Sequence, residues 1–355
     1  MKSPLTLLAG KTAFERIQAH GLDATLFDTV IGASGGAKLL ALTHLDRYVF
    51  GEFFASSNHC VELFGSSIGT WRHVAAASPE PVCALTALQE RYLNQSWDES
   101  DKRSATQIVD ELCEWVVDGF CTTDVAEYVC TTSRFRTHIV TARGRGLNSR
   151  PAGPLLGAGM AAGAALNVLH RRLLASLFQR IVFSSGECVA FQFEDFNTAH
   201  VALTPSILKS ALLASGSIPF LMSGERDIPG APRGYLWDGG IVDYHFDFKN
   251  FCGDGLVLYP HFSTRTVKGW FDKPLPWRRN RAKELDKVLL LAPSEEYLQH
   301  LPYGKIPDRK DFTRLAPADR LRYWNTAMLQ SHALRDAFAE VVTAADPAQF
   351  LTLIH

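Results

Sequence analysis

The chain has 355 residues, of which 46% are hydrophobic, 21% charged and 11% aromatic. This composition excludes a disordered, collagen-like or coiled-coil protein, and the length suffices for one large domain or two smaller ones. The net charge of −1 excludes a protein that binds nucleic acid through an overall positive charge.

The predicted elements alternate between strands and helices from the first residues onward. Residues 5–9 form a short apolar run that predicts a strand, residues 12–20 predict a helix, and residues 27–31 predict a second strand followed by a second helix. This order is typical of an α/β protein with a largely parallel sheet. Further strands are predicted at 60–64, 137–142, 181–184, 199–203, 255–259 and 287–292, and helical segments at 80–127 and 311–345.

Two parts of the chain are expected to differ in role. Residues 1–262 hold the motifs described below and are predicted to form the core domain. Residues 263–355 are predicted to be a mostly helical C-terminal extension packed on that core. Three roles stay open for this extension: it completes the sheet, caps the cleft or binds a partner.

The cysteines and the first residues indicate a cytoplasmic protein. The seven cysteines are odd in number, and no pair has the C-x-x-C spacing, so we expect reduced, mostly buried thiols rather than disulfides or zinc ligands. The apolar run at residues 4–10 is too short for a signal peptide and is followed directly by Lys11.

A nucleophile is predicted in the turn after the second strand. Gly32-Ala33-Ser34-Gly35-Gly36 fits the G-x-S-x-G pattern between a strand and a helix, where small neighbours let a serine hydroxyl project. The Gly35 N–H, at the start of the helix, is a candidate oxyanion donor. The alternative is an ordinary glycine-rich turn in which Ser34 caps the helix.

Three other readings of this glycine-rich turn fail. A phosphate-binding loop needs a hydroxyl residue after its lysine, but Leu39 follows Lys38. A dinucleotide fingerprint needs glycines at a different spacing after the first strand. A lipase-type Ser–Asp–His triad needs several strands before its serine, and Ser34 comes too early.

A general base is predicted in the second half of the core. Asp238-Gly239-Gly240 follows the strand-like Tyr235-Leu236-Trp237, and about twenty residues upstream lies Ala214-Ser215-Gly216-Ser217-Ile218-Pro219-Phe220. In order and spacing, these segments and the serine motif resemble the patatin-like phospholipase family. The resemblance spans residues 5–247, and it implies a three-layer α/β/α fold with a Ser34–Asp238 dyad and no catalytic histidine.

The proposed Ser34–Asp238 dyad predicts an unusual pKa for Asp238, and a triad with a histidine is the alternative. A carboxylate that accepts the serine proton must be a stronger base than usual, so we expect a partly desolvated Asp238 with a raised pKa. A Ser–Asp–His arrangement with His245 or His261 stays an alternative.

The oxyanion hole departs from the family pattern. The family has a glycine-rich loop after its first strand, whereas this chain has only Gly10 followed by Lys11 at that place. We therefore predict Gly10, Lys11 and Gly35 as the oxyanion residues. The missing glycines make a weak, altered or lost activity an open alternative.

Three segments could contact a lipid surface. Residues 128–186 contain eight Arg and no acid, and residues 265–287 contain eight Lys/Arg, three acids and two Trp. Residues 155–169 are uncharged and rich in Gly and Ala; a buried helix, an interfacial lid and a membrane span all stay open.

These patterns predict a serine acyl hydrolase that cleaves lipid ester bonds through an acyl-Ser34 intermediate. It would need no metal or cofactor, and it would act in the cytoplasm with peripheral contact to an anionic membrane. Two alternatives stay open: a catalytically weak lipid-binding or regulatory protein on the same fold, and an esterase or thioesterase that acts on soluble substrates.

Overall fold

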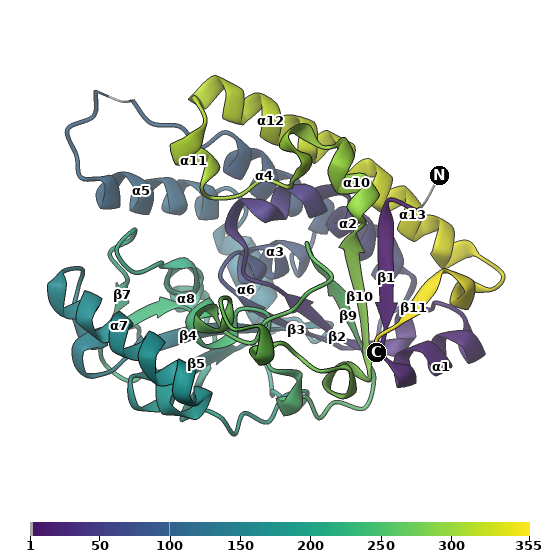
Figure 1. Cartoon of the computed structure of the whole chain (residues 1–355), viewed down its shortest axis with the longest axis horizontal. Helices are drawn as coiled ribbons and strands as arrows, with labels where there is room; N and C mark the ends of the chain where they lie inside the picture. Colours follow the sequence, from purple (N-terminus) through teal and green to yellow (C-terminus); the bar gives the residue numbers. More distant parts are fainter. Residues whose placement is uncertain (1–2, 99) are drawn as a thin grey trace.

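A single mixed sheet forms the centre of the protein. The computed structural model describes residues 3–98 and 100–355. Its path of hydrogen-bonded strands runs β11-β1-β10-β9-β2-β3-β4-β5-β6, with β8 paired to β4 and β7 to β8 (Figure 1). The strands are β1 (Leu5–Ala9), β2 (Phe27–Gly32), β3 (Val61–Ser66), β4 (Phe135–Gly144), β5 (Phe178–Ser184), β6 (Thr198–Ala202), β7 (Glu225–Arg226), β8 (Tyr235–Asp238), β9 (Leu256–Pro260), β10 (Val288–Pro293) and β11 (Leu351–Leu353).

Helices connect most of these strands. They are α1 (Lys11–His20), α2 (Thr43–Tyr48), α3 (Ile68–Ala76), α4 (Pro81–Leu93), α5 (Ala105–Asp118), α6 (Thr123–Thr131), α7 (Pro154–Leu169), α8 (Pro205–Gly216), α9 (Gly240–Asp243), α10 (Glu295–His300), α11 (Asp311–Arg314), α12 (Pro317–Gln330) and α13 (His332–Thr343). A 3-10 helix, η2 (Gly36–Leu42), follows the glycine-rich turn after β2.

The central strands of the sheet, such as β9 and β10, are buried on both faces, and they are apolar along their length. Alternate residues of one strand point to opposite faces, so Leu289 and Leu291 of β10 join one core cluster and Leu290 joins the other. The first cluster holds residues of α1–α6, α8, α10, α12 and α13; the second holds residues of α7, α9 and irregular segments. The chain is therefore α/β, and its layering is compatible with a three-layer α/β/α fold.

The C-terminal segment belongs to the same sheet as the rest of the chain. β10 lies between β1 and β9, and β11 pairs with β1, where the last strand runs beside the first (Figure 1). The predicted extension at 263–355 thus completes the sheet, which was one of its three open roles. Its helices α12 and α13 cover part of one face.

One expectation about buried groups needs correction, and one question that the sequence left open, the burial of α7, has an answer. Among the cysteines, Cys60, Cys83 and Cys252 are exposed and the other four are half-buried, so the thiols are not mostly buried. Helix α7 is buried on one face only: Leu156 and Met160 are inside, whereas Leu155 and Leu169 are exposed. Among the described helices, none has the length and hydropathy of a membrane span.

Candidate active site

The turn between β3 and α3 places a serine in a strained backbone conformation. Ser67 has φ 54° and ψ −133°, a region that residues other than glycine rarely occupy. It is the central residue of Gly65-Ser66-Ser67-Ile68-Gly69, a second G-x-S-x-G pattern in the chain. Strand, strained serine and helix in direct succession are the features of a nucleophile elbow.

The two glycines of this elbow are required by close packing. A Cβ on Gly69 would lie 2.0 Å from the carbonyl oxygen of Gly32, and one on Gly65 would lie 2.8 Å from the backbone carbon of Gly69. Any side chain at either position would therefore collide with backbone. The absence of side chains here lets α3 begin immediately after β3 and pack against β2.

Strand pairing brings Asp238 to the elbow. The first six residues of β4 pair with β3, up to Ser66 opposite Val140, and the next three pair with β8, whose last residue, Asp238, lies opposite Thr141. Since β3 runs parallel to β4 and β8 runs antiparallel to it, the carboxyl ends of β3 and β8 meet. The Ser67 hydroxyl donates a hydrogen bond of 2.8 Å to Oδ2 of Asp238.

Further hydrogen bonds fix both side chains. The Gly240 N–H donates to Oδ1 of Asp238 at 2.7 Å. The Ser67 N–H donates to Oγ of Ser215, at the end of α8, and that hydroxyl donates to the Val140 carbonyl. Ser215, which belongs to the Ala214–Phe220 segment singled out in the sequence, thus links the backbone of Ser67 to that of β4.

The surroundings make Asp238 a stronger base than an ordinary aspartate. Burial raises its pKa to about 6, against the opposing effects of the Ser67 hydroxyl, the Gly240 N–H and the cations Lys273 and Arg309. The side chain is 8% exposed. The expected increase in the pKa of Asp238 is therefore confirmed, and its cause is desolvation, as the sequence argument required.

Ser34 lies next to this pair but is not part of it. Its hydroxyl forms hydrogen bonds with the hydroxyl of Ser66, at 2.7 Å, and with the Ser66 carbonyl. Both side chains lie beside Gly240: a Cβ on this glycine would be 2.7 Å from Ser34 Oγ and 2.9 Å from Asp238 Oδ1. The hydroxyl of Ser34 nevertheless forms no hydrogen bond with the carboxylate of Asp238. The expected Ser34–Asp238 hydrogen bond is wrong; the acceptor is engaged by Ser67.

Gly10 and Lys11 are far from this place, which corrects the predicted oxyanion hole. They follow β1, which is separated from β3 by three other strands and runs antiparallel to its neighbour β10. β10, β9, β2 and β3 are mutually parallel. The carboxyl end of β1, where Gly10 lies, is therefore at the end of the sheet opposite to the carboxyl end of β3, where Ser67 lies. Lys11 is exposed there and pairs with Glu15.

Gly35, the third predicted oxyanion residue, does lie near the elbow. β2 and β3 are adjacent and parallel, with Gly32 opposite Gly65, so the loop at Gly35 and the turn at Ser67 leave the sheet side by side. Within the part of the chain that the structure describes, neither the Gly35 N–H nor the Ile68 N–H donates a hydrogen bond. Two free amides on neighbouring loops are the usual composition of an oxyanion hole.

The two histidines of the alternative triad are engaged elsewhere. Nδ1 of His245 accepts a hydrogen bond from the Val267 N–H, and His261 bonds with Ser263. Burial lowers the pKa of both imidazoles, that of His261 to about 3. Among the described residues, no histidine hydrogen-bonds to Ser34, Ser67 or Asp238.

Sequence reasoning missed Ser67, although the signal was present. The pattern at 65–69 follows the predicted strand at 60–64 and precedes a helix, so it meets the same criteria as the pattern at 32–36. The two pentapeptides differ in that only the second has its serine in the left-handed region.

Comparison with known proteins adds no assignment. No protein-family model matches the chain, and no curated protein matches its sequence. Residues 3–98 and 100–355 contain no group of three His, Cys, Asp or Glu side chains placed to hold a metal ion.

Proposed function

We propose that the protein is a serine acyl hydrolase in which Ser67, rather than Ser34, is the nucleophile and Asp238 is the general base. The observation that carries this proposal is the 2.8 Å hydrogen bond between a serine held in a strained elbow and a buried carboxylate. Exposure agrees with the assignment, since Ser67 retains 7% of its accessible surface and Ser34 only 1%.

The proposed reaction follows ordinary acyl transfer. Asp238 accepts the Ser67 proton while Oγ forms a bond to the ester carbonyl carbon, and the negative charge develops on the carbonyl oxygen. The Ile68 and Gly35 N–H groups are placed to stabilise that oxygen. The tetrahedral intermediate then releases the alcohol, which takes the proton from Asp238. Water then attacks the acyl carbon while Asp238 accepts one of the water protons. The bond between that carbon and Ser67 Oγ breaks, Oγ takes the proton from Asp238, and the carboxylic acid leaves.

The surface near α7 supports a lipid ester as the substrate. Leu155, Val168 and Leu169 of α7 and Leu173 beyond it are between 41% and 73% exposed. Phe220, in the segment after α8, is 50% exposed and lies 4.0 Å from the position of a Cβ on Gly157 of α7. A group of exposed apolar side chains of this kind is typical of a surface that meets a membrane or a lipid aggregate.

One of the two observations behind the catalytically weak alternative no longer supports it. The missing glycines are those around Gly10, which lies at the opposite end of the strands from the proposed dyad; the two basic segments, 128–186 and 265–287, keep the alternative open. The loop beside Ser67 is instead Gly32–Gly36, which is rich in glycine.

Fluorophosphonate labelling with peptide mapping tests the nucleophile. We expect label on Ser67 in the wild type, loss of label in Ser67→Ala, and retained label in the matched control Ser34→Ala. Hydrolysis of a short-chain ester should fall by more than about 10³-fold in Ser67→Ala. Label on Ser34, or equal hydrolysis by wild type and Ser67→Ala, would overturn the assignment.

A second assay tests the substrate class. Turnover of one ester is measured below and above its critical micelle concentration. A lipid hydrolase should be faster on the aggregate, because exposed apolar residues bind it. An unchanged rate would favour the alternative of an esterase or thioesterase that acts on soluble substrates.

A further inference from the structure

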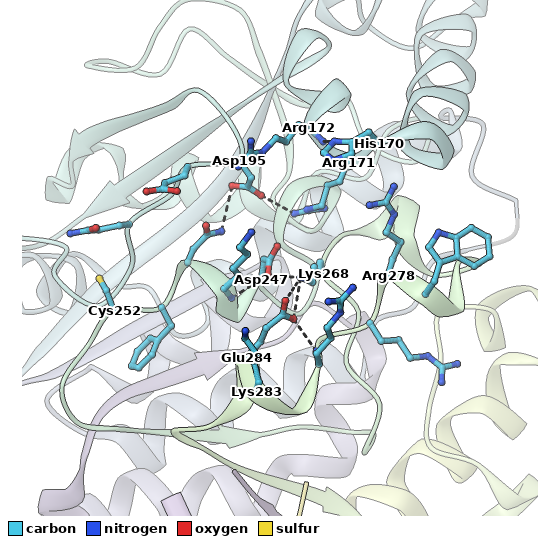
Figure 2. A pocket seen from close by; sticks show the side chains of 18 residues that line it. His170, Arg171, Arg172, Asp195, Asp247, Cys252, Lys268, Arg278, Lys283 and Glu284 are labelled. Atoms are coloured by element: carbon cyan, nitrogen blue, oxygen red, sulfur yellow. Dashed lines mark hydrogen bonds and ion pairs between the residues drawn. The ribbon is translucent and has the colours of Figure 1, made fainter. Parts of the chain in front are cut away.

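A large basic cavity lies apart from the proposed dyad. Its volume is about 720 Å³, and it is enclosed by the start of the 3-10 helix after α7, the loop after β5, the segment before β9 and the irregular segment before β10 (Figure 2). The charged lining residues are Arg171, Arg172, Lys249, Lys268, Arg278, Arg279, Arg281 and Lys283 against Glu194, Asp195, Asp247 and Glu284. This basic pocket is therefore positive in a chain whose net charge is −1.

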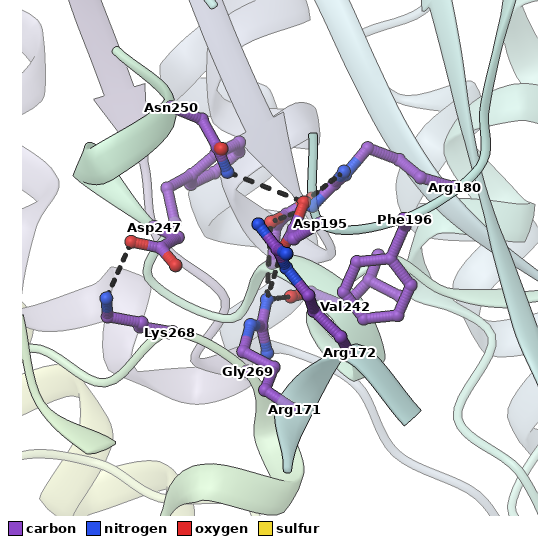
Figure 3. Close-up of polar contacts among 12 residues, drawn as sticks. Arg171, Arg172, Arg180, Asp195, Phe196, Val242, Asp247, Asn250, Lys268 and Gly269 are labelled. Atoms are coloured by element: carbon purple, nitrogen blue, oxygen red, sulfur yellow. Dashed lines mark hydrogen bonds and ion pairs between the residues drawn. The ribbon is translucent and has the colours of Figure 1, made fainter. Parts of the chain in front are cut away.

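Three of the four acids of the basic pocket are already paired with cations of the protein. Asp195 pairs with Arg180 at 2.8 Å and with Arg171 at 3.4 Å. Lys268 pairs with Asp247 at 2.7 Å (Figure 3) and with Glu284 at 3.1 Å (Figure 2). These pairs form the wall of the pocket, and they leave Glu194 as its one acid without an ion pair among the described residues.

The cations at the rim have no such partners. Arg172, Lys249, Arg279, Arg281 and Lys283 are exposed, and none forms an ion pair with an acid in residues 3–98 or 100–355. Like charges gathered at one opening repel one another, which costs the empty protein stability. Such an arrangement is stabilised when an anion binds.

A half-buried arginine adds a directional donor. Arg278 donates from Nη2 to the Asn167 carbonyl at 3.1 Å, while its buried Nε has no hydrogen-bond partner in the described structure. Buried donors are normally satisfied, so an unpaired guanidinium nitrogen in the lining of a charged cavity indicates a missing acceptor.

The charges and the donor geometry select the ligand class. We infer that the basic pocket binds a multiply phosphorylated ligand, because five unpaired cations exceed what one carboxylate or one phosphate can neutralise. Arginine forks match phosphate oxygens in pairs, and three of the five rim cations are arginines. The exposed side chain of Trp277 offers an apolar wall beside them. This inference is independent of the proposed dyad.

Such phosphates could belong to a soluble compound or to a lipid headgroup. The exposed Leu169 and Leu173 flank His170–Arg172 at the pocket, so a headgroup could enter from a membrane bound to that apolar surface. The experiment therefore has a soluble arm and a membrane arm.

Calorimetric titration with inositol hexakisphosphate is the soluble arm. Co-sedimentation with phosphatidylcholine vesicles containing phosphatidylinositol bisphosphate, against vesicles of phosphatidylcholine alone, is the membrane arm. Binding to the soluble probe without binding to the phosphoinositide vesicles identifies a soluble ligand, and binding to these vesicles, with or without the soluble probe, identifies a headgroup. Binding in neither arm overturns the proposal.

Charge-matched variants locate the binding. Arg279→Gln with Arg281→Gln should weaken binding about tenfold or more, since each charged hydrogen bond contributes substantially. The matched control, Arg314→Gln with Arg322→Gln, removes two exposed charges outside the pocket and should leave binding unchanged. Equal losses in both double variants would show unspecific charge attraction and overturn the site. Unchanged thermal unfolding in each variant shows that the fold is intact.

Discussion

The substitution Asp238→Asn should stabilise the folded protein while it removes activity. Burial raises the pKa of this carboxyl from an ordinary value of 3.8 to about 6. At about 1.36 kcal/mol for each pH unit, the ionised form costs the folded state about 3 kcal/mol above pH 6. An asparagine has no charge to desolvate, and its amide can still bond with Ser67 and with the Gly240 N–H.

The stabilisation by Asp238→Asn should depend on pH, and linkage gives the direction. Because the folded state binds the Asp238 proton more tightly than the unfolded chain, its stability falls as pH rises from about 4 to about 6 and stays lowered above that range. Well below pH 3.8 the carboxyl is protonated in both states, so the wild type and Asp238→Asn should then be equally stable.

Urea unfolding at pH 8.0, 6.0 and 4.0 measures the difference. We expect the free energy of unfolding of Asp238→Asn to exceed that of the wild type by up to about 3 kcal/mol at pH 8.0, by somewhat less at pH 6.0 and by only about 0.5 kcal/mol at pH 4.0. The matched control Asp254→Asn changes an exposed carboxylate and should show no such trend. A variant that is less stable than the wild type at pH 8.0, or a pH-independent difference, would refute the desolvation of Asp238.

Three other expectations follow from the same site. The acid limb of kcat/KM for ester hydrolysis should have its midpoint near pH 6, where Asp238 loses its proton; a midpoint near 4 would contradict its role as base. Lys273→Met should move that midpoint upward, because this cation lowers the pKa of Asp238, and a downward movement would contradict the charge assignment. Gly69→Ala should destabilise the protein by about 2 kcal/mol or more, since the new methyl group would meet the Gly32 carbonyl, whereas Gly157→Ala in α7 should be neutral or stabilising; equal urea midpoints for the two would count against the packing argument.

The local sequence determined the elements of the fold and the chemistry of one site residue. Apolar runs predicted β1–β6, β8, β9 and β10, because buried strands are apolar along much of their length, whereas the short strands β7 and β11 were not predicted. Asp238 was also recognisable from the two glycines that follow it. The structure gives the reason for the first of them: a Cβ on Gly239 would lie 2.0 Å from the Val140 carbonyl oxygen.

Only the tertiary structure decided which serine meets that carboxylate. Ser34 and Ser67 stand in equivalent local patterns, each between a strand and a helix, and nothing within either pentapeptide specifies a distant neighbour. The decision comes from β4, which pairs first with β3 and then with β8, and thereby sets Ser67 against Asp238. The direction of β1 also depends on strand pairing: because β1 runs antiparallel to β10, Gly10 lies at the end of the strands opposite to Ser67. Strand order and direction depend on contacts between residues far apart in the chain, so local patterns alone do not determine them.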